Sequence, residues 1–461
     1  MRKFVMMGCL ESNQSKLFYS FNLESYVPQG HLLRGIDQYL DLSNLRQHLS
    51  QFYSHTGRPS IDPELMIRML IIGYCFGIRS ERQLCEEVHL NLAYRWFCKL
   101  GLDDEVPDHS TFSKNRHGRF RQSGAFRQLF EDVLKRCMLE GLVQGEGFAT
   151  DASIIKASAQ RMNSVPGREI MDWLNGEDKS RPVQEYLDGL ETSTLNFTPK
   201  YVSLSDPSAT WTAAPGGPAF FAYCTNYLID LKAGIILDVE ATTVNKTAEV
   251  EATQAMMERV ECQYNIKPER FVGDTNYGSA GMLHWLVEDK NIAPHVPVWE
   301  KAERNDDSLS RSDFEWIAED NEYRCPQGKP LKVNWRDFKS PRTHVTKADT
   351  IIYRASKKDC DLCPLKPKCC PNIPMRKIAA SIYESSRDVA RAIAKTEAYQ
   401  QSRKDRKKIE MLFAHLKRIL KMDKLRLRGL SGAQDEFLLA ATAQNLRRMA
   451  MWLAPEMQKI S

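Results

Sequence analysis

The stretch AFFAYCTNYLIDLKAGIILDVEATTVN, residues 219–245, decides the fold class. Its two apolar runs are rich in aromatic and β-branched residues and predict two strands, with the break at 230–234 as a hairpin turn. The following segment TAEVEATQAMMERVECQY, residues 247–264, has the apolar spacing of an amphipathic helix. A hairpin followed at once by a helix indicates strands and helices in one domain.

The same alternation extends outward in both directions. GLVQGEGFATDASIIKAS (141–158) predicts a strand that ends at Asp151, and ERFVGDTNYGS (269–279) predicts a short strand that stops at Asp274. A helix in MLHWLVEDKN (282–291) and a short strand in APHVPV (293–298) complete the series. We therefore predict an α/β fold, a mixed sheet flanked by helices. Residues 161–217 are polar and rich in Pro, Gly and Ser, and are expected to form a long surface excursion.

The N-terminal quarter of the chain shows helix signals rather than strand signals. In GRPSIDPELMIRMLIIGYCFGIRSERQL (57–84), Pro59 and Asp62-Pro63 mark a helix start, and Ser80 is a candidate N-cap for the next helix. Short helices with tight turns predict an all-α domain over residues 51–125, preceded by an N-terminal arm over 1–50. A helix-turn-helix that binds DNA and a dimerisation domain both fit this pattern.

The positive charge of the chain is concentrated in one element. The 461 residues carry a net charge of only +5, whereas Arg403 to Arg428 contains eleven Lys and Arg against three Asp and Glu, a local net charge of +8. Such a segment is expected to contact nucleic-acid phosphates. No apolar run reaches the ~18 residues that span a bilayer, so a cytoplasmic protein with reduced thiols is expected.

Three carboxylates are candidate metal ligands. Asp151 and Asp274 follow strands of one sheet, and Glu410 lies on the helix that returns after an insertion. Two aspartates and a glutamate suit two Mg²⁺ ions, or Mn²⁺, which prefer oxygen ligands and leave room for phosphate. Spacing alone leaves the alternative open that the aspartates are turn or cap residues and Glu410 one half of a surface ion pair.

The residues around Glu410 suggest how DNA would be held. Arg406, Glu410 and Lys417 fall on one face of a helix at ~3.6 residues per turn. The acid would hold metal while the basic neighbours hold phosphate. The candidate DNA-binding residues are Arg403, Arg406, Lys407, Lys408, Lys417 and Arg418.

Several of these motifs together resemble the DDE transposases of bacterial insertion sequences. The likeness rests on TDASIIKA (150–157), VGDTNYGS (272–279), the R-x3-E-x6-K pattern of RKKIEMLFAHLK (406–417) and LRLRGL (425–430). It extends to residues 57–84 and to DHSTFSKNR (108–116) in the helical domain. The family usually has a tyrosine three residues before the arginine, where this chain has Arg403, and Tyr399 lies one turn earlier.

The resemblance implies a fold, an activity and partners. It implies an RNase H-like core with Asp151, Asp274 and Glu410 as catalytic residues, each a ligand of the two Mg²⁺ ions. It also implies cleavage at transposon ends, strand transfer into target DNA, and a homodimer on double-stranded DNA. A non-catalytic DNA-binding regulator and a structure-specific nuclease on the same core are the alternatives. Asn245 and His295 are candidates near the site, and we interpret both as structural.

A charged, irregular insertion over residues 299–385 divides the core into 126–298 and a helical part, 386–461. It contains Cys325 in RCPQGKPL and Cys360, Cys363, Cys369 and Cys370 in KKDCDLCPLKPKCC. A C-x2-C pair with further cysteines predicts a structural Zn²⁺ site of Cys325, Cys360, Cys363 and Cys369, with Cys370 competing for the fourth place. Such an ion would fold a polar segment that lacks its own core. The alternative is that these thiols are free, and the seven scattered cysteines are expected to pack as small apolar residues.

Overall fold

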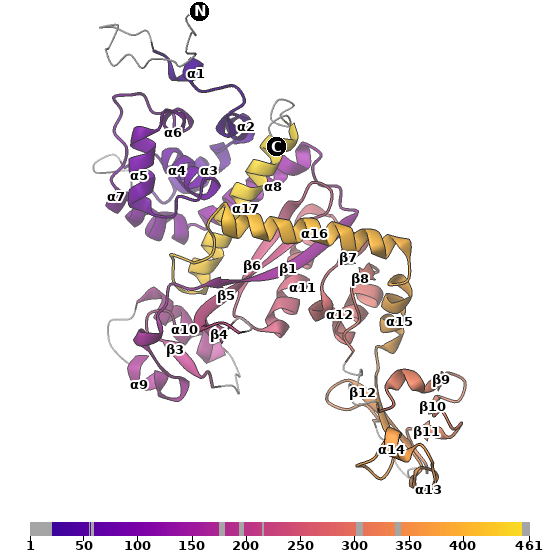
Figure 1. The fold of residues 1–461 in the computed structure, drawn as a ribbon. Coiled ribbons are helices and arrows are strands. Elements are labelled where there is room, and N and C mark those ends of the chain that lie inside the picture. The colour runs from indigo at the N-terminus through magenta and orange to yellow at the C-terminus, as the bar shows by residue number, and fades with distance from the viewer. Residues whose placement is uncertain are drawn as a thin grey trace, which may run out of the picture. The chain divides into compact units, whose positions relative to one another are not determined.

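The computed structural model describes residues 21–54, 56, 60–174, 180–192, 198–213, 216–300, 308–336 and 343–453 (Figure 1). Internal contacts divide the chain into two compact units. One comprises Met1–Ala125 together with Met449–Ser461, and the other is Phe126–Arg448. None of the described helices is both long enough and apolar enough to cross a membrane.

The first unit is helical, as predicted, and its helices begin earlier than expected. Residues 23–50, predicted to belong to an arm, form three helices because Leu33, Ile36, Leu45 and Leu49 are buried. Residues 1–20 lie outside the described part of the chain. The elements are α1 (Leu23–Tyr26), α2 (Leu32–Tyr39), α3 (Ser43–Ser50), α4 (Pro63–Cys75), α5 (Glu81–Leu90), α6 (Leu92–Phe97), α7 (His109–Asn115) and a π-helical turn η1 (Arg116–Phe120).

Side-chain caps fix where these helices start. Asp62 caps α4 by accepting the backbone N–H of Glu64, with Pro63 in the first turn. Ser80 caps α5, as predicted, and Asp108 caps α7. Pro59 is outside the described residues. Helix α4 is buried from Met66 to Cys75 rather than along one stripe, so it forms the centre of this unit.

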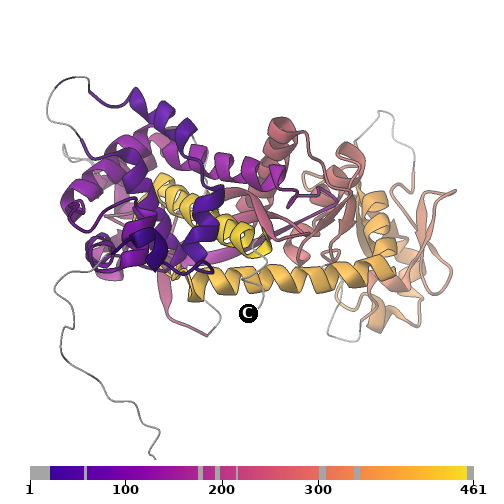
Figure 2. The same ribbon diagram turned by 90° about the horizontal axis from the view of Figure 1, so that it is seen from above.

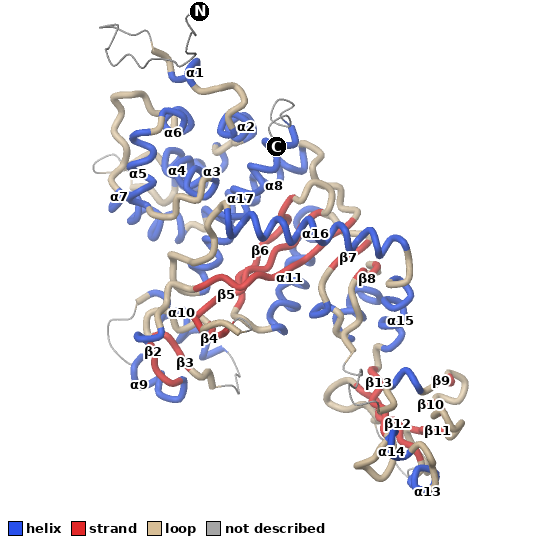
Figure 3. Tube along the Cα trace, viewed as in Figure 1, coloured by secondary structure: helices blue, strands red, loops and turns tan. Residues whose placement is uncertain are grey.

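A mixed sheet forms the centre of the second unit, as predicted (Figure 3). Its order is β4-β5-β1-β7-β8, with β6 also paired to β5. Strands β1, β7 and β8 are parallel, whereas β4, β5 and β6 are antiparallel to their neighbours, and β5 and β6 form the expected hairpin. The strands are β1 (Gly147–Lys156), β4 (Thr210–Ala213), β5 (Ala219–Asp230), β6 (Ile235–Thr242), β7 (Arg270–Val272) and β8 (Ala293–His295).

Helices cover both faces of this sheet. Helix α11 (Lys246–Tyr264) packs on β5 and β6, and α16 (Glu397–Arg418) packs on β1 and β7. On β1 the hydroxyl of Thr150 lies 3.1 Å from that of Thr253 in α11. The next residue of β1, Asp151, pairs with Tyr227 of β5, and the Tyr227 ring stacks on Phe413 of α16. Since successive strand residues point to opposite faces, α11 and α16 lie on opposite sides of the sheet (Figure 2).

Other helices surround the sheet at its edges and ends. Asn445 of α17 accepts the backbone N–H of Ile236 and donates to its carbonyl, which ties α17 to strand β6. The remaining helical elements of the core are α8 (Ala125–Leu139), η4 (Thr275–Tyr277), α12 (Ala280–His284), η5 (Trp285–Asp289), α15 (Glu384–Ile393) and α17 (Leu430–Leu453).

The excursion after β1 is more ordered than predicted. Val165, Ile170, Val183 and Val202 form a small buried cluster of its own, and β4 joins the central sheet. The sequence did not reveal these strands because each has only three or four residues, within a segment of polar composition. The elements are η2 (Arg161–Asn163), β2 (Ser164–Pro166), η3 (Gly167–Glu169), α9 (Ile170–Leu174), α10 (Arg181–Thr192) and β3 (Tyr201–Ser203).

The insertion is likewise not irregular, which corrects the prediction. It forms a five-stranded antiparallel sheet, β13-β12-β11-β10-β9, with a small core around Tyr323, Leu331 and Tyr353. Three of its strands have three residues, too few to show a hydrophobic alternation in the sequence. The elements are η6 (Arg311–Asp313), β9 (Glu315–Ile317), β10 (Glu322–Arg324), β11 (Pro330–Lys332), β12 (Thr350–Ala355), α13 (Lys357–Asp361), α14 (Lys366–Cys369) and β13 (Lys377–Ser381).

Candidate active site

Asp151 lies in the middle of strand β1, not at its end as predicted. The parallel pairing with β7 stops at Ala149, which is opposite Val272, while the antiparallel pairing with β5 continues to Lys156. Beyond Ala149, β1 therefore has a strand on one side only. Asp151 lies beside this open edge, and its Oδ1 accepts the backbone N–H of Ala152 at 2.9 Å.

Asp274 follows β7 closely, as predicted. It is two residues beyond Val272, just as Asp151 is two residues beyond Ala149, so the strand register brings both aspartates to the same level of the sheet. Its Oδ1 caps the 3-10 turn η4 by accepting the N–H of Asn276 at 2.8 Å. Asp274 can therefore cap this turn and still be a candidate metal ligand.

Glu410 lies on α16, the helix that covers β1 and β7. Its side chain is 57% exposed, and the Nε of Arg406 lies 3.8 Å from its Oε1. That weak i, i+4 pair is the surface ion pair considered as the alternative from the sequence. At this separation and exposure it contributes little stability and leaves most of the carboxylate available.

The electrostatics of Asp151 unite the three acids. The pKa of Asp151 is raised from 3.8 to about 6, mainly by burial; the negative charges of Asp274 and Glu410 add to this rise, while the N–H of Ala152 and the charge of Arg406 oppose it. A carboxyl group senses neighbouring charges in this way only when they are close. Asp274 and Glu410 therefore lie close enough to Asp151 to affect its pKa.

These carboxylates do not by themselves form a closed ligand set. Within the described parts of the chain, no three His, Cys, Asp or Glu side chains form a group placed to hold a metal ion. Like charges repel one another, so separated carboxylates are expected where no cation balances them. The donors are all oxygen atoms, the type that Mg²⁺ and Mn²⁺ prefer.

The segment LRLRG after α16 anchors the helix beside β1. The N–H of Leu425 donates to the carbonyl of Lys156 at 2.8 Å, and the buried Glu436 accepts the N–H groups of Arg426 and Leu427. Gly429, whose φ is +80°, donates its N–H to the buried carboxylate of Asp206. These bonds fix the end of α16 against the strand that carries the first aspartate.

Two family models match separate parts of the chain. A model described as a transposase domain matches residues 21–118, in the helical unit. A second, described as a transposase DDE domain, matches residues 324–450, which include Glu410, Arg406 and Lys417. The two matches support a DDE transposase of insertion sequences. No solved structure matches it.

The basic residues of the transposase divide into two groups by exposure. Arg403, Lys407, Lys408 and Arg418 are exposed on α16. Arg406 and Lys417 are partly buried beside the acids. Burial lowers the pKa of the Lys417 amine, and the nearby Cys224 and Asp151 partly offset that effect.

The residues that we interpreted as structural have structural contacts. Asn245 caps α11 by accepting the N–H of Thr247 at 3.0 Å. His295 is buried, and its Nδ1 lies 2.8 Å from the Oγ of Ser402, which ties β8 to α16. Tyr399 is also buried and packs near the His295 ring, so it faces inward.

Glu249 of α11 is a fourth acid near the site that the sequence did not single out. It accepts a hydrogen bond from the Sγ of Cys224 at 3.2 Å. Burial raises the pKa of Glu249, and the charge of Asp274 raises it further. The only signal in the sequence is its position, four residues after the cap Asn245. Because α11 contains several other glutamates, this signal does not distinguish Glu249 from them.

The cysteines of the transposase fall into two classes. Cys75, Cys98 and Cys137 are buried, as predicted, and Cys224 is buried but donates a hydrogen bond to Glu249. Cys262 is exposed, against the prediction, because it lies on the solvent side of α11. Cys85 is partly buried, and Cys9 is outside the described residues. The five cysteines of the insertion instead line one cavity.

Proposed function

We propose that this transposase cuts DNA at transposon ends and joins them to target DNA with Asp151, Asp274 and Glu410 as its catalytic residues. The observation that carries the proposal is the electrostatic effect of Asp274 and Glu410 on Asp151, since the three residues lie far apart in the sequence. Two aspartates at one level of a sheet and a glutamate on the covering helix place three negative charges in one region of the fold. Such a site is costly unless cations balance it.

The donor chemistry suits two Mg²⁺ or Mn²⁺ ions, held by Asp151, Asp274 and Glu410. When bound, such ions activate an attacking water or 3′-hydroxyl and stabilise the leaving oxygen of a phosphodiester. The chain itself supplies the carboxylates and their spacing, and it partly buries Asp151. The raised pKa of Asp151 supports this role, since a bound cation would restore its ionised form.

The sheet order supports an RNase H-like core. Strand β1 lies between the antiparallel pair β5 and β6 and the parallel strands β7 and β8. The candidate acids occupy β1, the end of β7 and the helix over both. This is the arrangement that the family resemblance implies.

The basic residues of α16 would hold the DNA. Arg406 and Lys417 lie beside the acids and would position the scissile phosphate and its neighbour. The exposed Arg403, Lys407, Lys408 and Arg418 would follow the phosphate backbone away from the site. Lys408 also pairs with Asp405 at 3.0 Å, which leaves it a weaker candidate than the other three.

The remaining partners are inferred from the reaction. The helical unit would recognise the terminal inverted repeats, and joining two ends at one target would require at least a homodimer. The short helices α5 and α7, with caps at Ser80 and Asp108, are the candidate helix-turn-helix elements.

Cleavage of a duplex that carries the native transposon end tests the proposal. Wild-type protein with Mg²⁺ should nick the end and produce strand-transfer products, whereas Asp274→Ala should bind the duplex and cut it no faster than background. Asp289→Ala is the matched control, because Asp289 is an exposed aspartate of the same region. Binding without cleavage by the wild-type protein would instead indicate a regulator, and cleavage without joining a nuclease.

A further inference from the structure

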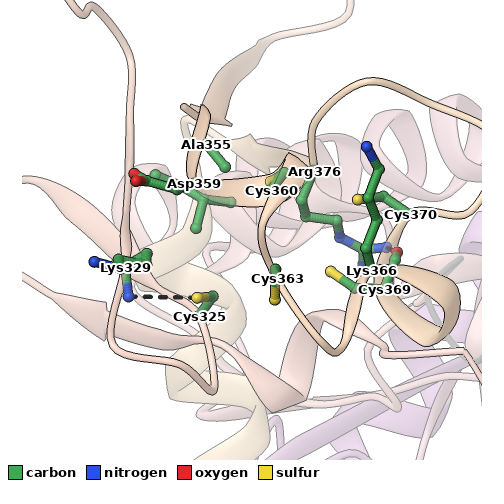
Figure 4. A pocket seen from close by; sticks show the side chains of 11 residues that line it. Cys325, Lys329, Ala355, Asp359, Cys360, Cys363, Lys366, Cys369, Cys370 and Arg376 are labelled. Carbon is green, nitrogen blue, oxygen red and sulfur yellow. Dashed lines mark hydrogen bonds between the residues drawn. The ribbon is translucent and has the colours of Figure 1, made fainter. Parts of the chain in front are cut away.

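The cysteine cavity of the insertion gathers thiols from two distant stretches of chain. Cys325 follows strand β10, whereas Cys360, Cys363, Cys369 and Cys370 lie around helices α13 and α14, and all five line the same cavity (Figure 4). The cavity volume is about 30 Å³. A single water molecule needs about 10–15 Å³ on the same measure, so the cavity suits a single ion rather than an organic ligand.

Two tight turns present the thiols to the cavity. At the first, the N–H of Gly328 donates to the carbonyl of Cys325 at 2.7 Å, and the N–H of Lys329 points to the Cys325 Sγ at 3.4 Å. Gly328 has a φ of +70°, which favours glycine. At the second, the N–H of Cys363 donates to the carbonyl of Cys360 at 3.2 Å. A backbone N–H that points to sulfur stabilises a thiolate there.

The charges around the cavity suit an anionic metal centre. A Zn²⁺ ion with four thiolates has a net charge of −2. Lys329, Lys366 and Arg376 line the cavity, against one acid, Asp359. Lys366 also pairs with Asp361, which leaves Lys329 and Arg376 as the main compensating charges.

Arg376 is held in place by backbone carbonyls. It is buried, and its guanidinium donates to the carbonyls of Cys369 and Leu309, both at 2.9 Å. These two bonds fix its charge next to the segment that carries Cys369.

The insertion needs a stabilising element beyond its apolar packing. Among its described residues, ten buried ones form a core, and three of these are Cys360, Cys369 and Cys370. A core this small rarely sustains a fold without disulfides or a metal. The thiols are not placed as a ligand group within the described residues, and metal binding would displace their protons.

We propose that the insertion binds one structural Zn²⁺ ion through Cys325, Cys360, Cys363 and Cys369. The four thiols release their protons to solvent, and the ion joins the turn after β10 to the helices α13 and α14. Cys369 is assigned because its carbonyl is fixed by Arg376 and its side chain is directed toward Cys363 in Figure 4. Cys370 is then a buried thiol beside the site.

Metal analysis of the full-length protein tests this proposal without any cleavage assay. Mass spectrometry of purified wild-type protein should find about one zinc per chain. Replacement by Co²⁺ should produce the visible absorption and thiolate-to-metal charge-transfer bands of a tetrahedral thiolate site. Absence of both zinc and these cobalt bands overturns the proposal, whatever the activity of the carboxylate site.

Single substitutions then test the ligand assignment. Cys363→Ser and Cys369→Ser should lose most of the bound metal, whereas Cys370→Ser should keep it. Cys262→Ser is the matched control, since Cys262 is exposed and outside the insertion. Retention by Cys369→Ser with loss by Cys370→Ser overturns the assignment of the fourth ligand.

Discussion

The carboxylate site and the cysteine cavity both bring ionisable side chains together, but over very different distances along the chain. Asp151 in β1 and Asp274 after β7 come before the insertion, whereas Glu410 lies on α16, after the insertion. In the cavity, Cys360 to Cys370 lie within two short helices and their turns, and only Cys325 comes from further away.

The difference follows from the donor chemistry. Carboxylates are ionised near neutral pH, so their site requires separation and partial exposure until cations arrive. Thiols are neutral until metal binds, and they can form part of a small core. The carboxylate site thus depends on the large fold around it, whereas the cysteines help to form the small fold in which they lie.

The largest expected effect comes from Glu410→Gln. Cleavage should fall by more than the roughly 10–100-fold typical of outer-shell partners of a metal site, because a direct ligand is lost. The melting temperature should not change, because Glu410 is exposed and its contact with Arg406 is weak.

Glu397→Gln, at the exposed start of the same helix, is the control for Glu410 and should keep full activity. A Glu410 variant that melts lower but still cuts would show that the residue is structural, like the cysteines. That outcome would remove the contrast between the two regions.

The second effect is on stability without metal. The pKa of Asp151 is raised in the folded state from 3.8 to about 6, so the folded protein favours the protonated form. In EDTA, ionisation of Asp151 should destabilise the fold progressively as the pH rises through this window, by about 2 kcal/mol between about pH 4 and about pH 7.

Urea unfolding of wild type and Asp151→Asn at several pH values measures this effect. The variant should become the more stable protein as the pH rises, because it has no charge to bury. If wild type and Asp151→Asn differ in stability by the same amount at each pH, burial and the neighbouring acids do not raise the pKa of Asp151.

The third effect concerns Glu249, the acid near Asp274 that the sequence did not reveal. Glu249→Gln keeps a hydrogen-bond acceptor for Cys224 but removes a negative charge beside the site. The Mg²⁺ concentration for half-maximal cleavage should rise by roughly tenfold or less, as for an outer-shell group. Glu251→Gln, an exposed neighbour on α11, should leave it unchanged.

The smallest effect is in the insertion. Gly328 has a φ of +70° with no neighbouring atom near the position of a Cβ, so Gly328→Ala is strained by its backbone alone. We expect about 1 kcal/mol of local destabilisation, measured as faster hydrogen exchange of residues 308–336. Gly328→Asn should be milder, since asparagine tolerates this conformation. Equal exchange in all three proteins would show that this turn is not needed to present Cys325.

The sequence by itself determined the local features of this protein. Caps at Asp62 and Ser80, the hairpin between β5 and β6, and the α/β alternation were predictable because neighbouring residues decide them. The three candidate acids were predicted from the motifs around each one, and the candidate zinc ligands of the insertion from the spacing of its cysteines.

Only the tertiary structure decided which distant groups meet. The register of β1 on β7 places Asp151 level with Asp274, although Asp151 lies within its strand, and the packing of α16 on both strands adds Glu410. The same packing brings Glu249 near the site and folds the short strands of the insertion into a sheet. The sequence around each of these residues does not reveal these contacts, because strand register and helix packing depend on the whole core.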